Sequence, residues 1–155
     1  MIIRKAELKD INDIVKLGFL EFLEEHCFET GQDFSYKSVS KNLEVIINNE
    51  NIGFVMVAET EIESSKIIGF ILVQYSCFIF SRQVIAHEIG WYIIREYRGK
   101  GAGGSLIKKA MDEVKEKGIT ILSLGMAFKN GSENQSLMYQ KYGFKPFQSF
   151  WFKEL

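Results

Sequence analysis

The densest run of glycines in the chain lies within Tyr97-Arg98-Gly99-Lys100-Gly101-Ala102-Gly103-Gly104-Ser105-Leu106. An apolar run, residues 89–94, precedes this stretch, and an amphipathic segment, residues 105–117, follows it. A short apolar run is typical of a buried strand, and apolar residues at intervals of three and four are typical of a helix. The sequence therefore predicts a basic, glycine-rich turn between a strand and the start of a helix.

Such a turn has the properties of an anion site. The first N–H groups of a helix have no partner within it, and they lie at the positive end of the helix dipole. Glycine adopts positive φ without penalty and lets a ligand approach the backbone closely. Successive amides then form a concave site that suits phosphate. Arg98 and Lys100 add positive charge, so we expect the turn to bind a diphosphate.

Three phosphate motifs compete for this turn. The letters Gly99-x-Gly101-x-x-Gly104 fit the dinucleotide fingerprint, which needs an acidic residue about 20 positions later. Residues 122–126 contain no acid. The phosphate-loop motif needs Ser or Thr after its lysine, whereas Gly101 follows Lys100. The third motif is Arg98-x-x-Gly101-x-Gly103. The alternative to all three motifs is an ordinary glycine-rich turn whose charges are solvated.

The whole chain fits one domain, residues 1–155, with a net charge of −1. A charge this close to zero favours neither nucleic acid nor a membrane as partner. Cys27 and Cys77 lack CxxC spacing, which favours a reducing compartment, and we expect the cytoplasm. His26 and His87 show no zinc-binding pattern, so no metal is expected. The oligomeric state, a homodimer included, is left open.

The chain in order alternates between helical and strand patterns. A first helix, residues 9–26, is expected to direct its charged residues outward, Glu21 and Glu24 among them. Ser35 or Ser38 is a candidate N-cap for the second helix, and Gly118 is a good residue to follow the third. The expected strands cover residues 1–5, 54–59, 67–80, 84–94, 119–126 and 144–152, and the expected helices cover 9–26, 39–47, 105–117 and 134–142. This order predicts a mixed α/β fold.

The element order and two motifs resemble the GNAT superfamily of acetyl-CoA-dependent N-acetyltransferases. The motifs are the turn from Arg98 to Gly103 and the later segment Tyr139-x-x-x-Gly143-Phe144. The similarity runs nearly end to end and is strongest over residues 88–144. It implies a mixed central sheet that splays open between two parallel strands, with helices on both faces. It also implies acetyl-CoA as co-substrate, with its pantetheine arm lying in the splay.

The resemblance also assigns candidate site residues. The backbones of Trp91 and Ile93 would meet the pantetheine arm, and Asn134 or Asn130 would replace an asparagine that the family often has at the position of Ser132. The diphosphate would meet the turn at Arg98, Gly99, Lys100, Gly101, Ala102, Gly103 and Gly104. The amide of Ile93 would also stabilise negative charge on the thioester oxygen.

The chemistry calls for a proton acceptor and a proton donor. An alkyl amine has a pKa near 10 and must lose a proton before it attacks a thioester. Glu88, on the strand before the turn, is the candidate base, and Tyr139 is the candidate acid for the departing thiolate. The alternatives are an ordinary strand carboxylate for Glu88 and a packed aromatic residue for Tyr139.

The acceptor is expected to be a small amine or a peptide N-terminus. Acidic and aromatic side chains suit an amine through ion pairing and cation–π contact. The candidates lie in the first two helices, the loop between them and a later hairpin, and they are Glu25, Glu29, Phe28, Phe34, Tyr36, Phe78 and Phe80. Two other functions stay open: a CoA-binding sensor without turnover, and a nucleotide-dependent oxidoreductase.

Overall fold

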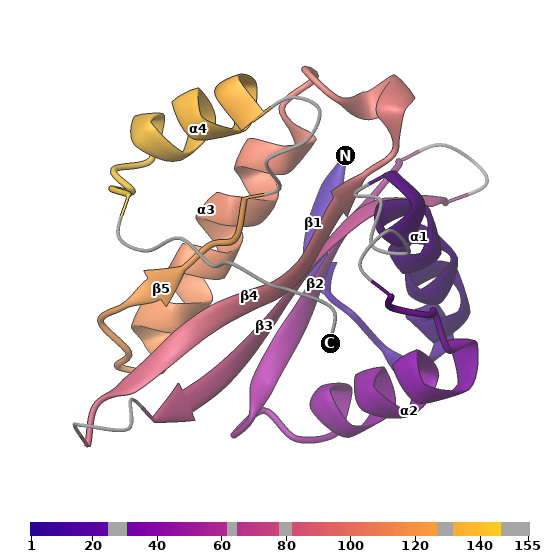
Figure 1. Ribbon diagram of the computed structural model, residues 1–155, viewed down its shortest axis with the longest axis horizontal. Helices are drawn as coiled ribbons and strands as arrows, with labels where there is room; N and C mark the ends of the chain where they lie inside the picture. The colour runs from indigo at the N-terminus through magenta and orange to yellow at the C-terminus, as the bar shows by residue number, and fades with distance from the viewer. Residues whose placement is uncertain (25–30, 62–64, 78–81, 127–131, 147–155) are drawn as a thin grey trace.

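The computed structural model describes residues 1–24, 31–61, 65–77, 82–126 and 132–146. The strands in this part of the chain are β1 (Ile2–Lys5), β2 (Gly53–Glu59), β3 (Ile67–Cys77), β4 (Val84–Ile93) and β5 (Leu122–Ser123). The helices are α1 (Ile11–Glu24), α2 (Tyr36–Ile47), α3 (Ala102–Glu116) and α4 (Ser132–Lys141), with short 3-10 turns η1 (Leu8–Asp10) and η3 (Arg95–Tyr97). The expected mixed α/β fold is confirmed (Figure 1).

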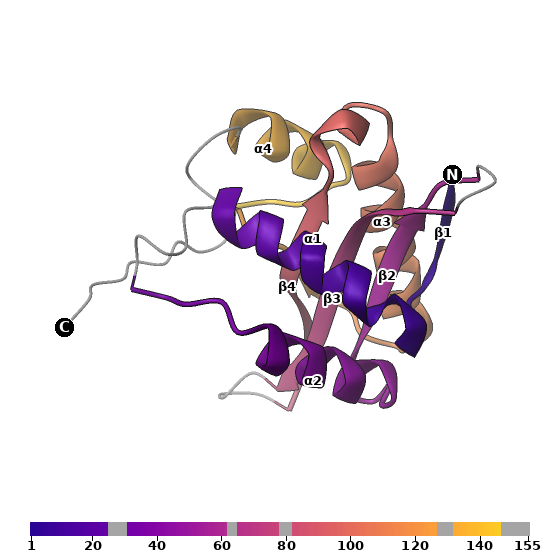
Figure 2. The same ribbon diagram turned by 90° about the vertical axis from the view of Figure 1, so that its right-hand side faces the viewer.

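The strands form one sheet in the order β1-β2-β3-β4-β5. The first four are antiparallel neighbours, and β4 pairs with β5 in parallel. Helices α1 and α2 cover one face, and α3 covers the other (Figure 2). Side chains of β2 alternate between the two faces of the sheet, and both faces are buried. Phe54 and Met56 join the cluster that contains α3, and Val55 and Val57 join the cluster that contains α1 and α2.

Several predicted boundaries are confirmed by local geometry. The Ser35 side chain accepts a hydrogen bond from the Ser38 N–H and so caps α2, which satisfies one of the unpaired donors of that helix. Gly118 follows α3 with φ of 72°. Helix α3 begins three residues before the expected Ser105, because Gly101 serves as its N-cap. Of the expected last strand, residues 144–146 are in no strand and residues 147–152 lie outside the described part.

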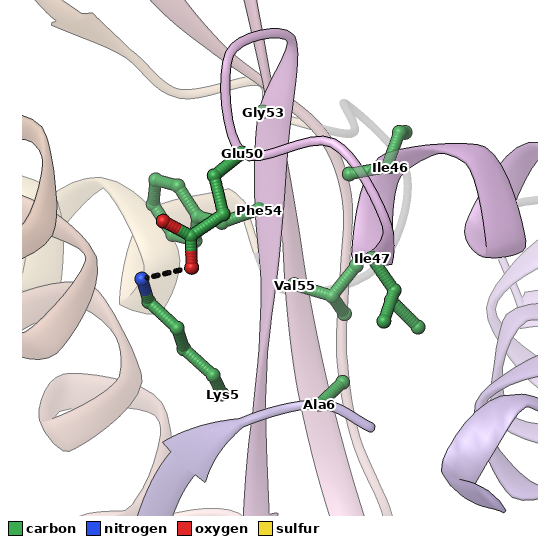
Figure 3. A pocket seen from close by; sticks show the side chains of 8 residues that line it. All are labelled: Lys5, Ala6, Ile46, Ile47, Glu50, Gly53, Phe54 and Val55. Carbon is green, nitrogen blue, oxygen red and sulfur yellow. Dashed lines mark hydrogen bonds and ion pairs between the residues drawn. The ribbon is translucent and has the colours of Figure 1, made fainter. Parts of the chain in front are cut away.

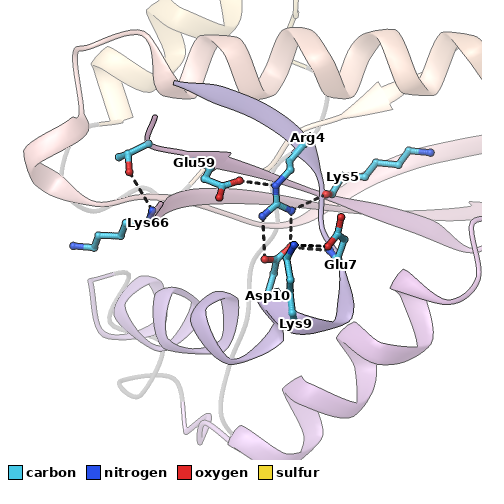
Figure 4. A network of polar contacts seen from close by, with 8 residues as sticks. Arg4, Lys5, Glu7, Lys9, Asp10, Glu59 and Lys66 are labelled. Carbon is cyan, nitrogen blue, oxygen red and sulfur yellow. Dashed lines mark hydrogen bonds and ion pairs between the residues drawn. The ribbon is translucent and has the colours of Figure 1, made fainter. Parts of the chain in front are cut away.

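An ion network ties the N-terminal strand to the first helix (Figure 4). The Arg4 guanidinium donates to both carboxylate oxygens of Asp10, at 2.6 and 3.0 Å, and also to Glu59 on β2. Asp10 is only 4% exposed. Burial opposes its charge, but the hydrogen bonds from Arg4 and the Glu7 N–H outweigh that cost and lower the pKa of Asp10. This network fixes where α1 starts on the sheet.

The sheet splays open where β4 and β5 diverge. The two strands pair only at Ala86 with Leu122 and at His87 with Ser123. The expected strand over residues 119–126 is therefore too long, since only two of those residues are in β5. A β-bulge lies nearby, because Leu72 and Val73 on β3 pair with residues 90 and 88 of β4 and leave Ile89 unpaired.

Candidate active site

The glycine-rich turn presents uncapped amides at the start of α3. Gly99 and Gly101 have φ of 74° and 90°, and a Cβ at either position would meet nothing within 4 Å. No side chain caps α3, and its first backbone hydrogen bond runs from the Ser105 N–H to the Gly101 carbonyl, at 3.0 Å. The N–H groups before Ser105 thus remain available to an anion. This geometry fits the diphosphate of a coenzyme.

The other two glycines of the turn serve packing. A Cβ on Gly103 would lie 2.9 Å from Cζ2 of Trp91, and one on Gly104 would lie 2.3 Å from the hydroxyl of Tyr142. Both glycines are in helical positions, so positive φ is not the reason for them. They let β4 and the segment that follows α4 approach the first turn of α3. The sequence reasoning gave all four glycines to ligand approach, and the structure divides these roles.

Arg98 is held by α1. Its Nη2 donates to Oε2 of Glu24 at 2.7 Å, and its Nε donates to the carbonyl of Ile93 at 2.8 Å. Glu24 also accepts from the Tyr92 hydroxyl at 2.7 Å and from Nε of Arg95 at 3.0 Å. The guanidinium of Arg98 therefore binds protein groups in this structure, where it positions the turn.

The charges around Glu24 explain two pKa shifts. Burial opposes the charge of Glu24, but hydrogen bonds from Tyr92 and Arg98, with the charges of Arg98 and Arg95, hold its pKa below the usual value. Burial, followed by the hydrogen bond to Glu24, raises the pKa of Tyr92 to about 12. Glu24 thus stays ionised at neutral pH and joins α1, β4 and the turn. The expectation that Glu24 faces outward is wrong.

Backbone N–H groups on the side of β4 that faces away from β3 point into the splay. The Ile94 N–H donates to the Ile68 carbonyl on β3 at 2.9 Å. Because these groups alternate along an antiparallel strand, the N–H groups of Trp91 and Ile93 point away from β3. This is the orientation that the resemblance implies for contact with a pantetheine arm. The Trp91 N–H already donates to Oε1 of Glu21 on α1, at 2.7 Å, so the expectation that Glu21 faces outward is also wrong.

Glu88 and Tyr139 both bind the backbone of Gly125, just beyond β5. The Gly125 N–H donates to Oε2 of Glu88 at 2.8 Å, and the Tyr139 hydroxyl donates to the Gly125 carbonyl at 2.7 Å. Gln135 donates to the Tyr139 hydroxyl at 2.9 Å, and the Tyr139 ring lies 6.1 Å from that of Trp91. The structure therefore brings the two predicted catalytic side chains together at the splay. Side-chain hydrogen bonds to Gly125 also give a reason for the early end of β5.

A cavity of about 280 Å³ lies at this junction. Its described lining comes from α1, β4, the segment after β5 and α4, and consists of Glu21, Glu88, Ile89, Gly90, Trp91, Gly125, Met126 and Gln135. Ligand pockets are commonly of a few hundred cubic ångströms with a few convergent polar groups, which this cavity matches. It lies directly beside the candidate base and the inward-pointing amide of Trp91.

A second hollow is a poorer candidate. It holds about 50 Å³ between β1, the end of α2 and the start of β2 (Figure 3). Its lining is largely apolar, and its two charged groups, Lys5 and Glu50, pair with each other at 2.9 Å. A space this small, with its charges already matched, offers little to a coenzyme or an amine.

Other predicted site residues lie apart from the junction or outside the described residues. Asn134 is exposed in the first turn of α4, and Asn130 lies outside the described residues. Phe34 and Tyr36 pack against each other and against Phe19 of α1 in edge-to-face or tilted geometry, at centroid distances of 5.1 to 5.4 Å. The remaining acceptor candidates lie outside the described residues: Glu25, Phe28, Glu29, Phe78 and Phe80.

The sequence reasoning missed Glu21, Gly125 and Gln135 as residues of the junction and Glu24 as the partner of Arg98. Glu21 and Glu24 are three residues apart and so share one side of α1, which is a signal of a common target. The described residues contain no group of three or more His, Cys, Asp or Glu that could hold a metal. None of the helices among them has the length and hydropathy of a membrane span.

Comparison with known proteins agrees with this geometry. Residues 51–146 match the model of the acetyltransferase (GNAT) domain family. An Archaeoglobus fulgidus protein described as an uncharacterized N-acetyltransferase is 27% identical over 127 residues, 80% of each chain. The fold is similar to that of a predicted acetyltransferase with acetyl-CoA from Clostridium acetobutylicum, with a TM-score of 0.74, 19% identity and coverage of 99% of this chain and 95% of that one.

A further solved structure extends the likeness in fold. The ribosomal-protein-alanine N-acetyltransferase from Brucella melitensis aligns with a TM-score of 0.71 at 14% identity, over 100% of both chains. At such identities the structural likeness supports the fold alone. The family model, by contrast, covers well over half of this sequence, including β2 to β5 and the glycine-rich turn. The chain therefore belongs to the GNAT acetyltransferases.

Proposed function

We propose that this chain is an N-acetyltransferase that moves the acetyl group of acetyl-CoA to a primary amine of a small molecule or a peptide N-terminus. The observation that carries the proposal is the meeting of Glu88 and Tyr139 at Gly125, on the cavity that opens between β4 and the segment after β5. A proton acceptor and a proton donor at one junction suit a reaction that removes one proton and delivers another.

The coenzyme would lie along the chain's own donors. The uncapped amides from Gly101 to Gly104 would hold the diphosphate, with Lys100 nearby. The amides of Trp91 and Ile93 point to where the arm would pass. The Trp91 N–H must exchange its hydrogen bond with Glu21 for one to the arm, since one N–H makes one good hydrogen bond.

The proposed step is direct attack with both substrates bound. The amine nitrogen forms a bond to the acetyl carbonyl carbon, and the carbon–sulfur bond of the thioester breaks. The carboxylate of Glu88 takes the first proton from the ammonium form of the amine, directly or through water. The phenol of Tyr139 gives its proton to the thiolate, and the second proton that the nitrogen loses on becoming an amide restores the phenol. Holding both reactants in one site supplies much of the remaining acceleration.

The test is thiol release from acetyl-CoA with a panel of polyamines, amino acids, aminoglycosides and N-terminal peptides. We expect release with at least one amine, and a slower rate or a shifted pH–rate profile for Glu88→Gln. CoA binding without turnover across the panel would favour the sensor. Binding of NAD(P)H instead of CoA would favour the oxidoreductase. Because its two cysteines lack CxxC spacing, we propose the cytoplasm as the location.

A further inference from the structure

Two exposed apolar side chains lie on the cavity beside the candidate base. Ile89 is 51% exposed although it lies within β4, and Met126, in the segment after β5, is 37% exposed. Both belong to the described lining of the cavity of about 280 Å³. A single exposed apolar side chain is common on a protein surface, but two on the wall of one cavity favour a ligand with an apolar part.

A β-bulge presents Ile89 to the cavity. On β3, Leu72 and Val73 pair with Gly90 and Glu88, so Ile89 has no partner residue on that strand. Bulges turn a side chain away from the regular alternation of a strand and are common next to active sites. Ile89 follows Glu88 directly in the chain, so a substituent of an amine held at the Glu88 carboxylate has Ile89 within reach.

The polar side chains on the described lining share one property, which is that each already has a partner within the protein. The hydrogen bonds join Glu21 to the Trp91 N–H, Glu88 to the Gly125 N–H and Gln135 to the Tyr139 hydroxyl. A polar tail on a ligand would have to compete for these groups. An apolar tail would instead cover Ile89 and Met126 and release the water that contacts them, which is favourable.

The position of these two side chains places them beyond the proposed coenzyme site. The glycine-rich turn follows the end of β4, and the pantetheine arm would pass the amide of Ile93 and then that of Trp91. Ile89 lies two residues farther from the turn, roughly 7 Å along a strand. The reactive end of the arm would therefore reach the part of the cavity that Ile89 and Met126 line, and the acceptor would lie there too.

We propose that Ile89 and Met126 bind an apolar substituent of the acceptor, so that the chain prefers primary amines with an aliphatic or aromatic group over amines with a hydroxylated one. This inference rests on the proposed function and names the substrate class for it. The competing account is that the two side chains contact another protein or a second copy of this chain. On that account, substitutions of Ile89 and Met126 leave the order of preference among amines unchanged.

Three probes isolate the apolar substituent: 1-aminopentane, 4-amino-1-butanol and aminoethane. The first two have the same number of non-hydrogen atoms and differ only in a terminal methyl or hydroxyl group, and the third lacks most of the chain. Burying one methylene is worth about fourfold in affinity, so three partly buried methylenes should give about tenfold. For the parent chain with acetyl-CoA, we therefore expect kcat/KM for 1-aminopentane to exceed that for each of the other two at least about tenfold.

Two variants make the surface polar, and a third is the matched control. Ile89→Thr keeps a β-branched side chain, and Met126→Gln keeps the length of the side chain. Each should lower kcat/KM for 1-aminopentane about fivefold or more, with a loss below about threefold for aminoethane. Val84→Thr makes the same kind of change on β4 at a residue that is 38% exposed and not among the described lining residues, so all three constants should stay within about twofold. A preference for 1-aminopentane that survives both Ile89→Thr and Met126→Gln would overturn the inference.

A binding measurement separates this inference from the proposed function. Calorimetry with CoA-loaded protein measures the affinities for 1-aminopentane and 4-amino-1-butanol without turnover. If neither is acetylated but 1-aminopentane binds more tightly and Ile89→Thr removes the difference, the inference stands and the enzymatic proposal falls. If both are acetylated with equal kcat/KM, the enzymatic proposal stands and the inference falls. If the parent chain neither acetylates nor binds 1-aminopentane, the assignment of Ile89 and Met126 is wrong.

Discussion

Glu24 offers a sharp test of how the site is held together. Its carboxylate accepts hydrogen bonds from Tyr92, Arg95 and Arg98 and so joins α1 to β4 and to the turn. Glu24→Gln keeps the size of the side chain and removes its charge. Tyr92 is buried, with 5% exposure, so its hydrogen bond to the carboxylate is the largest loss. The side chains of Arg95 and Arg98 are 73% and 46% exposed, so water screens their ion pairs with Glu24 and each pair adds little.

The expected loss follows from these contacts. Gln weakens but does not remove the hydrogen bond from the buried hydroxyl, and it removes two screened ion pairs. Together these losses should lower the free energy of unfolding by about 1–2 kcal/mol at pH 7. The pH dependence has a definite sign. The pKa of Glu24 is lower in the folded chain than in the unfolded one, so its stabilising contribution is present above the unfolded pKa. That contribution disappears as the pH falls through the folded pKa.

Urea denaturation at pH 7 and at pH 3, followed by circular dichroism, measures both effects. The parent chain should be more stable than Glu24→Gln at pH 7, and the difference should narrow at pH 3, which lies below the pKa of 4.5 of an unperturbed glutamate. Asp13→Asn, which removes an exposed charge from the same helix, should differ from the parent by less than about 0.5 kcal/mol at pH 7. Equal stability of Glu24→Gln and the parent at pH 7, or a gap that persists undiminished at pH 3, would refute this account of Glu24.

Two further predictions concern the packing of the turn and the proposed acid. Gly104→Ala should lower the melting temperature although alanine favours helices by about 1 kcal/mol, since the Cβ would lie 2.3 Å from the Tyr142 hydroxyl. In a Tyr142→Phe background that loss should largely vanish, and an equal loss in both backgrounds would contradict the packing role. Tyr139→Phe should lower kcat about hundredfold while the Kd for CoA changes less than about threefold. A rate equal to the parent's would remove Tyr139 as the proton donor.

Much of the fold is predictable because its signals are local. The glycines at 99 and 101, the helix caps at Ser35 and Gly118, and the alternation along β2 are all properties of neighbouring residues. Hydrophobic periodicity reports which side of an element is apolar. It is therefore enough to place the helices and most of the strands within a few residues of their observed bounds.

The unpredicted features depend on contacts between distant parts of the chain. Periodicity identifies Glu21 and Glu24 as part of a polar side of α1. It does not show whether that side faces solvent or polar groups of another part of the chain. That distinction depends on the Trp91 amide and on Arg98, which are about 70 residues away. Likewise, the apolar run at 119–126 fits a strand by pattern, but Gly125 donates to the Glu88 carboxylate and accepts from the Tyr139 hydroxyl where that ladder would continue.

The central claim is that the amides of the turn bind the diphosphate of coenzyme A, and two glycines that flank α3 test it. Gly101 and Gly118 lie at opposite ends of that helix, have φ of 90° and 72°, and face nothing within 4 Å where a Cβ would be. Alanine at either position costs about 1–2 kcal/mol of backbone strain. Only Gly101→Ala places a methyl group in the proposed diphosphate site.

The direct measurement is the Kd for coenzyme A, by calorimetry, of the parent, Gly101→Ala and Gly118→Ala. We expect Gly101→Ala to weaken binding at least about tenfold and Gly118→Ala to leave it within about twofold, although both lose similar stability. Equal affinity of the two variants for coenzyme A would contradict the assignment of the turn as the diphosphate site.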